Sequence, residues 1–296
     1  MGMTMAEKIL ARASKREKVS PNEFVTADLD LVMGHDLSFW AAYQAMKNNG
    51  FDQVFDPEKI VVIIDHLVPA MNVRAARAHQ QTREWVKKQN IKKFYDCGVG
   101  VCHQVMPEEG HTLPGGLIVG GDSHTTTYGA LGVASCGIGI SELAWSMAKG
   151  FLWFMVPETI RFDLAGKLPP GVSAKDIILK IAGDYTAEVA QYKAVEFSGP
   201  AAKALSMDGR MTISNMGVEI GAKFAFFESD EKTIEFLKGK NNKKVELFGP
   251  DSDAVYENIY SVDVSNLEPQ IACPHNVDNV KSIAEIGEVV VHQALL

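Results

Sequence analysis

The chain contains 296 residues, more than the roughly 100 to 200 residues of one ordinary domain, which predicts two α/β units or one large one. Hydrophobic residues make up 46% and charged residues 22%, values typical of a globular protein and not of a disordered one. The 29 Lys and Arg against 37 Asp and Glu give a net charge of −8, which argues against nucleic acid as the main partner.

The first residues and the cysteines bear on localisation. The first ten residues lack a basic segment followed by an apolar run, so we recognise no signal peptide and expect a cytoplasmic protein. In that compartment we expect Cys97, Cys102, Cys136 and Cys273 to be thiols, not disulfide partners. One long stretch without Asp, Glu, Lys or Arg, residues 123–141, has the length of a membrane span, but its His, Ser, Thr and Gly content excludes one.

Apolar patterning predicts strands and helices that alternate along the chain. Thr4 and Glu7 form a capping-box pattern that opens a first helix, and the β-branched run at 59–64 is typical of a buried parallel strand. Ser38 and Asn72 are expected to cap further helices. In chain order we predict a helix to about residue 15, a strand over 24–31, a helix over 39–49, a strand over 59–64, a helix over 73–89, strands over 93–96 and 117–119, a helix over 141–150, a strand over 159–164 and a helix after the capping box at Ser173.

This alternation predicts an α/β fold of three-layer α/β/α units with mostly parallel sheets, in which ligands bind beyond the carboxyl ends of the strands. The segment GKLPPG at 166–171 interrupts regular structure, and LFGPDSD at 247–253 is a weaker break. We therefore expect a first unit over residues 1–166, a second over 167–250, and the start of a third unit, cut off, over 251–296.

Polar side chains follow several predicted strands. Asp65 and His66 come after a buried strand, and a neighbouring carboxylate can orient an imidazole and raise its pKa for acid–base chemistry. The pair could equally face solvent at a strand end. Asp122 and His124 are two apart in an extended segment and so point to one side, a spacing that suits metal ligation or carboxylate binding. Ordinary turn chemistry is the alternative.

Further candidates are weaker on their own. His103 follows a Gly-rich turn and could be a ligand, an acid or a loop residue, and His35 with Asp36 could be a strand-end site or a loop pair. Asn215 and Glu219 are four apart, so they share a helix face if their apolar segment is helical, whereas the alternative is the exposed face of an amphipathic helix. The chain has no GxxxxGK[ST], HExxH, GxSxG or CxxC motif.

Taken in order, six motifs resemble the aconitase superfamily. The resemblance covers nearly the whole chain, and DSHTTTYGALG and SMDGRMTISNMGVEIGAK are most similar to the large subunit of 3-isopropylmalate dehydratase and its relatives, homoaconitase and 2,3-dimethylmalate dehydratase. The motifs are IDHLVP (64–69), GVCHQVMPEEG (100–110), GGDSHTTTYGALG (120–132), VPETI (156–160), KDIILKIAG (175–183) and RMTISNMGVEIGAK (210–223).

The resemblance implies a hydro-lyase that removes water from a hydroxy diacid such as 2- or 3-isopropylmalate and re-adds it, as in leucine or related amino-acid biosynthesis. It also implies a [4Fe-4S] cluster that acts as a Lewis acid, and a small, swivelling-domain subunit as partner in a heterodimer or heterotetramer. By motif position, the catalytic residues are Asp65, His66, His103, Asp122, His124 and Glu219, and the substrate-binding residues are His35, Ser123 and Asn215.

The cluster ligands depart from the family pattern. The family binds its cluster through one Cys in a GSCTN-type motif and two in a CxxC, and none of the four cysteines here matches either. We expect the chain to be an N-terminal portion of a longer protein whose cluster cysteines follow Leu296, with a naturally short, cluster-free relative as the alternative. Without those cysteines and the small domain, we expect the fragment alone to be inactive.

Two other functions compete with the hydro-lyase. A mononuclear metal hydrolase would use Asp122, His124, His66 and Glu219 as direct ligands, and bound zinc without iron or sulfide would favour it. A non-catalytic binding role, similar to the RNA binding of some aconitase relatives, is opposed by the acidic charge balance. A purely structural role leaves the strand-end His, Asp and Glu residues unexplained.

Overall fold

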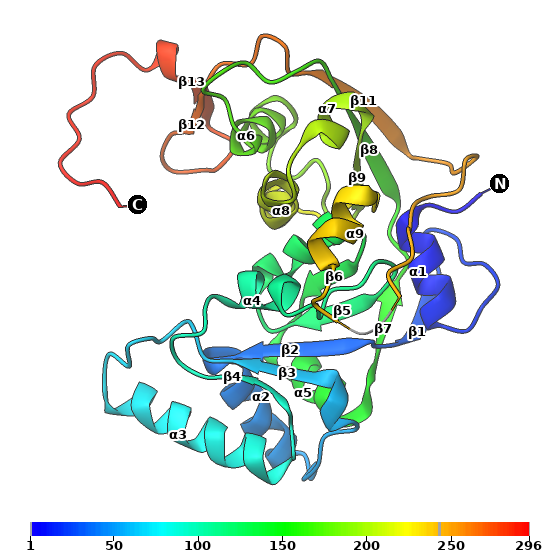
Figure 1. The fold of residues 1–296 in the computed structure, drawn as a ribbon, viewed down its shortest axis with the longest axis vertical. Helices are drawn as coiled ribbons and strands as arrows, with labels where there is room; N and C mark the ends of the chain where they lie inside the picture. The colour runs from blue at the N-terminus through cyan, green and yellow to red at the C-terminus, as the bar shows by residue number, and fades with distance from the viewer. Residues whose placement is uncertain (1, 242–243, 296) are drawn as a thin grey trace.

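Two mostly parallel sheets follow one another along the long axis of the molecule (Figure 1). We describe the protein from a computed structural model that covers residues 2–241 and 244–295. The lower sheet has the order β4-β3-β2-β5-β6 and the upper sheet β10-β9-β8-β11, with every neighbouring pair parallel. The strands are β4 (Lys93–Tyr95), β3 (Ile60–Ile63), β2 (Leu31–His35), β5 (Leu117–Gly120), β6 (Ala134–Gly137), β10 (Phe224–Phe227), β9 (Ala194–Ser198), β8 (Thr159–Ala165) and β11 (Asn258–Asp263).

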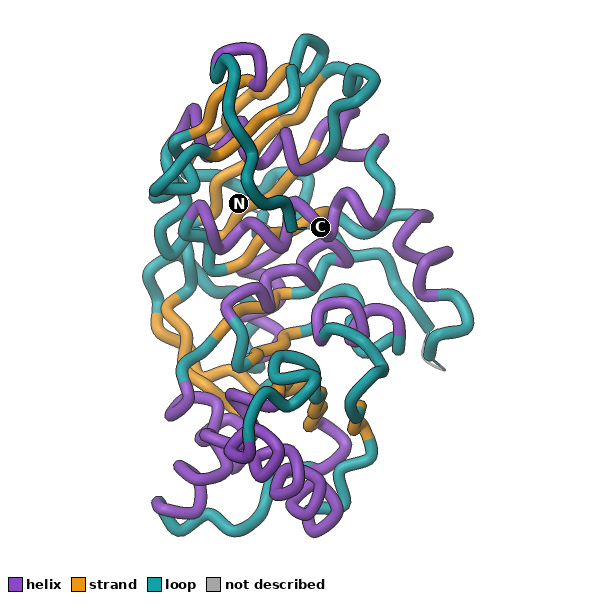
Figure 2. Tube along the Cα trace, turned by 90° about the vertical axis from the view of Figure 1, so that its left-hand side faces the viewer, coloured by secondary structure: helices purple, strands orange, loops and turns teal. Residues whose placement is uncertain are grey.

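Two antiparallel pairs of strands accompany the large sheets: β1 (Phe24–Asp28) with β7 (Phe151–Met155), and β12 (Gln270–Ala272) with β13 (Val280–Ser282). In side view, strands run through the upper and middle parts of the molecule with helices beside them, and the lower end is mostly helical (Figure 2). The helices are α1 (Met5–Ala13), α2 (Asp36–Asn48), α3 (Val73–Lys88), α4 (Cys102–Glu108), α5 (Ile140–Lys149), α6 (Ala174–Tyr185), α7 (Gly199–Ala204), α8 (Met207–Asn215) and α9 (Glu231–Leu237), with 3-10 turns η1 (Pro57–Lys59), η2 (Ser123–Leu131), η3 (Met216–Ile220) and η4 (Ile283–Glu285).

The lower sheet is the middle layer of three. Successive strand residues point to opposite faces, so Val32, Val62 and Val119 join a core with α1, α2 and α5, whereas Met33 and Val61 join a second core with α4, η2 and α8. Because both faces are covered, the inner strands β3 and β5 are apolar and fully buried, as is typical of parallel strands. The predicted α/β class with parallel sheets is confirmed.

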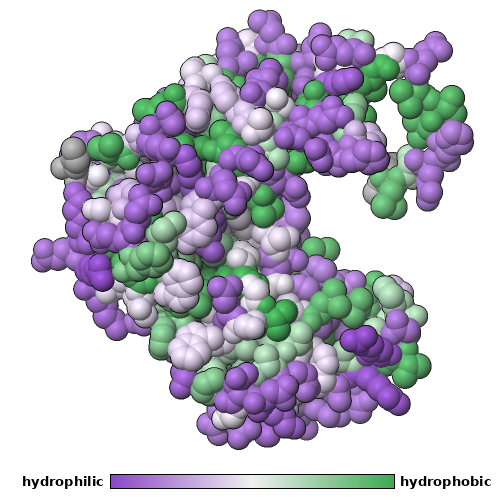
Figure 3. All heavy atoms as spheres, turned by 180° about the vertical axis from the view of Figure 1, so that it is seen from behind, coloured by the Kyte–Doolittle hydropathy of each residue, from purple (hydrophilic) through white to green (hydrophobic). Residues whose placement is uncertain are grey.

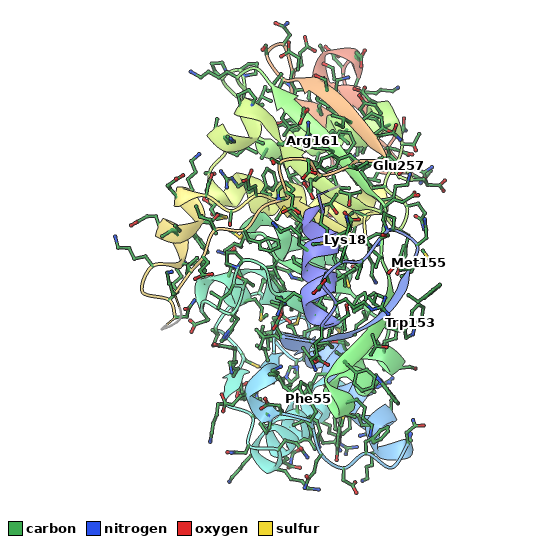
Figure 4. All side chains as sticks on the ribbon, turned by 90° about the vertical axis from the view of Figure 1, so that its right-hand side faces the viewer. Lys18, Phe55, Trp153, Met155, Arg161 and Glu257 are labelled. Atoms are coloured by element: carbon green, nitrogen blue, oxygen red, sulfur yellow. The ribbon has the colours of Figure 1, made fainter. Side chains whose placement is uncertain are left out.

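The upper sheet buries Ile160, Phe162 and Leu164 of β8 against α6, α7 and α8. Its other face meets α1, which crosses between the two sheets on the side shown in Figure 4, with Arg161 above it and Trp153 below. Both β8, which precedes the GKLPPG segment, and β11, which follows LFGPDSD, belong to this sheet. The division of the chain at residues 166 and 250 stays a prediction, because sheet membership alone does not test it.

Several local predictions are confirmed. The Thr4–Glu7 capping box starts α1, with the Glu7 carboxylate accepting the Thr4 N–H at 2.8 Å. The Asn72 side chain accepts the N–H of Ala75 at 2.9 Å and caps α3. The four cysteines are free thiols. Within residues 2–241 and 244–295, no helix combines the length and hydrophobicity that crossing a bilayer requires.

Two local predictions are wrong, and the condition attached to a third is not met. The predicted strand 24–31 is two strands, because the chain leaves β1 after Asp28 and enters the lower sheet at Leu31. Ser38 is not the N-cap of α2; the helix starts three residues earlier, and the His35 side chain accepts the N–H of Leu37 at 3.3 Å. Asn215 and Glu219 do not share one α-helix, since α8 ends at Asn215 and a 3-10 turn follows.

Candidate active site

The carboxyl ends of three neighbouring strands place polar side chains at one edge of the lower sheet. β2 ends at His35, β3 is followed by Asp65 and His66, and β5 is followed by Asp122. On the side of the molecule to which these strands point, the surface is hollowed between the lower helices and the upper part (Figure 3). This is the edge at which ligands of open α/β sheets bind.

His66 lies between two carboxylates. Its Nδ1 is 2.7 Å from Asp65 Oδ1 and its Nε2 is 3.1 Å from Asp122 Oδ2. Since carboxylates only accept, both ring nitrogens donate, which requires the imidazolium form. Burial alone would lower the pKa of His66, but its hydrogen bond to Asp65 and the charges of Asp65, Asp122 and Asp36 outweigh burial and raise that pKa. The ring also stacks on His35, with centroids 3.7 Å apart.

Asp122 is the shared acceptor of the site. Its Oδ1 accepts His103 Nε2–H at 2.7 Å and the N–H of His124 at 2.8 Å, while Oδ2 faces His66. Burial alone would raise the pKa of Asp122, but the hydrogen bond and charge of His103, with the backbone N–H, hold it well below its usual range. Asp122 therefore stays ionised and fixes two imidazoles at once.

A second imidazole–carboxylate pair lies beside the first. His124 Nε2 is 3.2 Å from Glu219 Oε1, and its Nδ1 is 3.1 Å from the Ser123 hydroxyl. The Asn215 amide donates to Thr127 Oγ1 at 2.9 Å and so holds the η2 turn that carries His124. Every residue predicted from the motifs is thus joined, directly or through this turn, to one network.

Exposure separates the groups that can meet a ligand from those behind them. The side chains of His66, His124 and Glu219 are 31%, 35% and 40% exposed, whereas those of Asp65 and His35 are 3% and 6% exposed. His66 and the His124–Glu219 pair therefore face the solvent. Asp65, whose second oxygen accepts the N–H of Cys102 at 2.6 Å, and His35, whose Nε2 donates to the Gly121 carbonyl at 2.9 Å, support them from below.

Sequence reasoning missed two buried members of this network, His79 and Tyr128, and named a third, Asp36, only as the neighbour of His35. Asp36 accepts the N–H groups of His66 and Leu67, His79 Nε2 donates to Asp36 at 2.9 Å, and the Tyr128 hydroxyl lies 3.3 Å from His103 Nδ1. A signal existed for His79, which falls on the inward stripe of α3 with Ala75, Thr82 and Val86.

Within the described residues, one group has the spacing of a metal site: His35, Asp36, Asp65 and His66, whose candidate ligand atoms lie within 4.8 Å of one another. It is not the set Asp122, His124, His66 and Glu219 expected for a metal hydrolase. Moreover, all four side chains already form hydrogen bonds within the protein, with one another or with backbone groups. The arrangement is an acid–base network with its donors and acceptors matched.

Comparison with known proteins agrees with this geometry. The family model described as "Aconitase family (aconitate hydratase)" matches residues 7–294. The chain is 49% identical over its whole length to the "Probable 3-isopropylmalate dehydratase large subunit" of Methanothermobacter thermautotrophicus, covering 71% of that protein. It is 46% identical to "3-isopropylmalate dehydratase large subunit 1" of Methanopyrus kandleri, again covering 71%, and 41% identical to the large subunit of Aquifex aeolicus, covering 68%.

The chain belongs to the aconitase family. The predicted resemblance and the predicted class of iron–sulfur hydro-lyase are therefore confirmed. Among solved structures, aconitase X of Thermococcus kodakaraensis aligns with 82% of this chain and 58% of its own, at 11% identity and a TM-score of 0.43. The relatives named above are called large subunits, which implies a small-subunit partner.

Membership in the aconitase family implies a [4Fe-4S] cluster, and clusters of this kind are held by Cys thiolates. Cys102 and Cys136 are buried, and burial raises the pKa of both thiols, which keeps them protonated. Cys97 is exposed, and Cys273 lies beyond β12. The group with metal-site spacing contains no cysteine. The cysteines of this sequence thus do not fit as cluster ligands.

Proposed function

We propose that this chain is the large subunit of a hydro-lyase that interconverts hydroxy diacids such as 2- and 3-isopropylmalate through an unsaturated intermediate. The observation that carries the proposal is the position of His66, which is partly exposed and lies between Asp65 and Asp122, two carboxylates that raise its pKa. Hydroxide is a poor leaving group, so dehydration needs a proton donor at the departing oxygen. The names of the relatives support the choice of diacid.

In this proposal each side chain acts where its exposure allows. His66 gives its proton to the departing hydroxyl as the C–O bond breaks, and a base from the small subunit would take the proton of the adjacent C–H bond; both protons return when water is re-added. Asp65 and Asp122 hold the His66 ring and stabilise its charge. The His124–Glu219 pair forms a second acid–base couple at the same opening. His103 acts through Asp122, Ser123 and Asn215 complete the substrate-facing surface, and His35 supports the His66 ring from below.

The proposed reaction also requires the iron–sulfur cluster, for which the four cysteines of this sequence do not fit as ligands. The cluster would supply Lewis-acid chemistry, and a small subunit would close the substrate site. The proposed assembly is a heterodimer or heterotetramer in the cytoplasm. The acid–base network described above is the part that these 296 residues contribute.

The test is an assay of the assembled enzyme, with its cluster and small subunit, on isopropylmaleate, dimethylmaleate and homoaconitate. We expect hydration of isopropylmaleate to be fastest; a preference for dimethylmaleate or homoaconitate would instead identify a 2,3-dimethylmalate dehydratase or a homoaconitase. Zinc-dependent hydrolysis, with no hydration of any of the three, would overturn the hydro-lyase proposal.

The His66→Gln substitution tests the proton donor. We expect it to lower kcat at least about 100-fold, the usual contribution of a general acid. His111→Gln is the matched control, because His111 hydrogen-bonds to Tyr95 and takes no part in the network. Near-normal turnover in His66→Gln would refute the role assigned to His66.

A further inference from the structure

Asp36 is a buried carboxylate that the proposed acid–base chemistry does not use. Its side chain is fully buried beneath the loop that carries His66. It is the first residue of α2, where a negative charge is favoured by the helix dipole. That position explains why a carboxylate is tolerated there, but it does not explain where its two oxygens point.

Both oxygens of Asp36 bind the chain after β3. Oδ1 accepts the backbone N–H of His66 at 3.0 Å, and Oδ2 accepts that of Leu67 at 2.8 Å. These N–H groups lie at the end of a parallel strand, where no further strand pairing satisfies them. A buried carboxylate that accepts two backbone N–H groups fixes that backbone firmly, because charge-assisted bonds are the strong ones.

His79 completes the arrangement from α3. Its Nε2 donates to Asp36 Oδ2 at 2.9 Å, and its side chain is 4% exposed. The Cys97 thiol lies 4.0 Å from the other ring nitrogen, Nδ1, which can therefore remain an acceptor. With three hydrogen-bond donors on its two oxygens, Asp36 is ionised: burial alone would raise its pKa, but the nearby His35 ring and the hydrogen bonds from Leu67, His79 and His66 lower it well below its usual range.

We propose that Asp36, held by His79, is a positioning residue that sets the place of His66 between Asp65 and Asp122. The inference rests on the proposed function in so far as His66 is the proton donor. The distances that matter are short: His66 must keep contacts of 2.7 and 3.1 Å to two carboxylates and its stack on His35. A loop free to shift by about 1 Å would lose them, and such misplacement can reduce rate by roughly 100-fold.

The test is Asp36→Asn, which keeps the shape but replaces one acceptor oxygen by an NH₂ donor. His79 can adapt by changing tautomer, whereas a backbone N–H cannot, so one of the N–H groups of His66 and Leu67 must lose its partner. Asp30→Asn is the matched control, because Asp30 accepts the backbone N–H of Leu117 at the opposite end of the same sheet. His79→Gln keeps a donor toward Asp36 and serves as the conservative variant.

The first measurement needs no catalysis. Amide hydrogen exchange by NMR should show the His66 or Leu67 N–H exchanging at least about tenfold faster in Asp36→Asn, with both protected as in the parent in Asp30→Asn. The pKa of His66, which faces Asp65, Asp122 and the stacked His35 besides Asp36, should also fall when the Asp36 charge is removed. Unchanged exchange in a folded Asp36→Asn protein would overturn the proposal even if the enzyme proves to be a hydro-lyase.

The second measurement is turnover of the assembled enzyme. Asp36→Asn should lower kcat roughly 10- to 100-fold with little change in KM, because the substrate-facing side chains remain. The acid-donating limb of the pH profile should move to lower pH, in step with the pKa of His66. His79→Gln should retain most activity. Equal losses in Asp36→Asn and Asp30→Asn would mean general destabilisation and would overturn a positioning role.

Discussion

Asp36 in the lower part and Glu196 in the upper sheet are both buried carboxylates, yet their surroundings act on them in opposite directions. Asp36 lies at a strand end and receives two backbone N–H groups and His79. Glu196 lies within β9, facing α1, and receives one backbone N–H, from Met5 at 2.8 Å, and the Tyr256 hydroxyl at 2.7 Å. The pKa of Asp36 is lowered, and burial raises that of Glu196 to about 7.

The difference shows what keeps a buried carboxylate charged in this fold. Each carboxylate loses its hydration on burial, which favours the neutral form. Only a sufficient number of hydrogen-bond donors makes the ionised form the stable one again. The free N–H groups after β3 and β5 supply those donors at the carboxyl edge of the lower sheet. A mid-strand residue such as Glu196 has no comparable supply, because the neighbouring backbone N–H groups pair within the sheet. Strand ends thus stabilise the charges that acid–base chemistry needs.

The largest effect should follow from changing Asp122, the carboxylate that accepts hydrogen bonds from two imidazoles and a backbone N–H at this edge of the sheet. Asp122→Asn in the assembled enzyme replaces one acceptor oxygen by a donor that faces His103 or His66. We expect kcat to fall roughly 100- to 10,000-fold, since two imidazoles lose their common hydrogen-bond acceptor and with it their orientation. Steady-state hydration kinetics measure this loss. A loss below about tenfold would mean that the shared carboxylate is not the centre of the site.

Glu196→Gln tests the other half of the comparison through stability. The folded-state pKa of about 7 exceeds the ordinary value of 4.5, so Glu196 binds its proton more tightly in the folded protein. Its contribution is complete below about pH 4.5 and is lost as pH rises through 7. Between about pH 5 and pH 8 the parent should lose about 2–3 kcal/mol of unfolding free energy relative to the Gln variant.

Urea unfolding at both pH values measures this difference. Glu188→Gln, at an exposed carboxylate in the same part of the chain, is the matched control and should follow the parent. Parallel pH dependence in parent and Glu196→Gln would show that Glu196 keeps an ordinary titration despite its burial. The number of donors would then not be what separates it from Asp36.

The sequence predicted the parts of this site that depend on local pattern. Asp65, His66 and Asp122 were recognisable because each follows an apolar run long enough for a buried strand, and parallel strands bring such ends together. Asn72 was correctly predicted as an N-cap because its hydrogen-bond partner, the N–H of Ala75, is only three residues further along the chain. The α/β class followed from the same alternation of strands and helices.

What escaped prediction depends on packing between distant elements. Ser38 looked like the cap of α2, but the buried strand β2 runs directly into the helix, so His35 takes that place. The pairing of His79 with Asp36 joins residues 43 apart, and no local rule specifies it, although His79 lies on the buried stripe of α3. Glu219 meets His124 because the chain turns after Asn215, where helical periodicity had indicated a continuous face.

The smallest effect should come from Tyr128→Phe, which tests how much an uncharged hydrogen-bond donor contributes to the site. The Tyr128 hydroxyl is fully buried and lies 3.3 Å from His103 Nδ1, while Nε2 donates to Asp122. Losing one neutral hydrogen bond at a buried nitrogen costs about 1 kcal/mol, so kcat should fall less than about tenfold.

Nitrogen-15 NMR of the His103 ring distinguishes the reason for any change. With Tyr128 present, the tautomer protonated at Nε2 should dominate, because Nδ1 accepts from the hydroxyl and Asp122 demands a donor. In Tyr128→Phe the same tautomer should persist, since the ionised Asp122 alone suffices to select it, and the variant should therefore resemble the parent. A shift toward the Nδ1 form would mean that a neutral hydroxyl, like that of Tyr256 at Glu196, governs charge placement here as strongly as a carboxylate does.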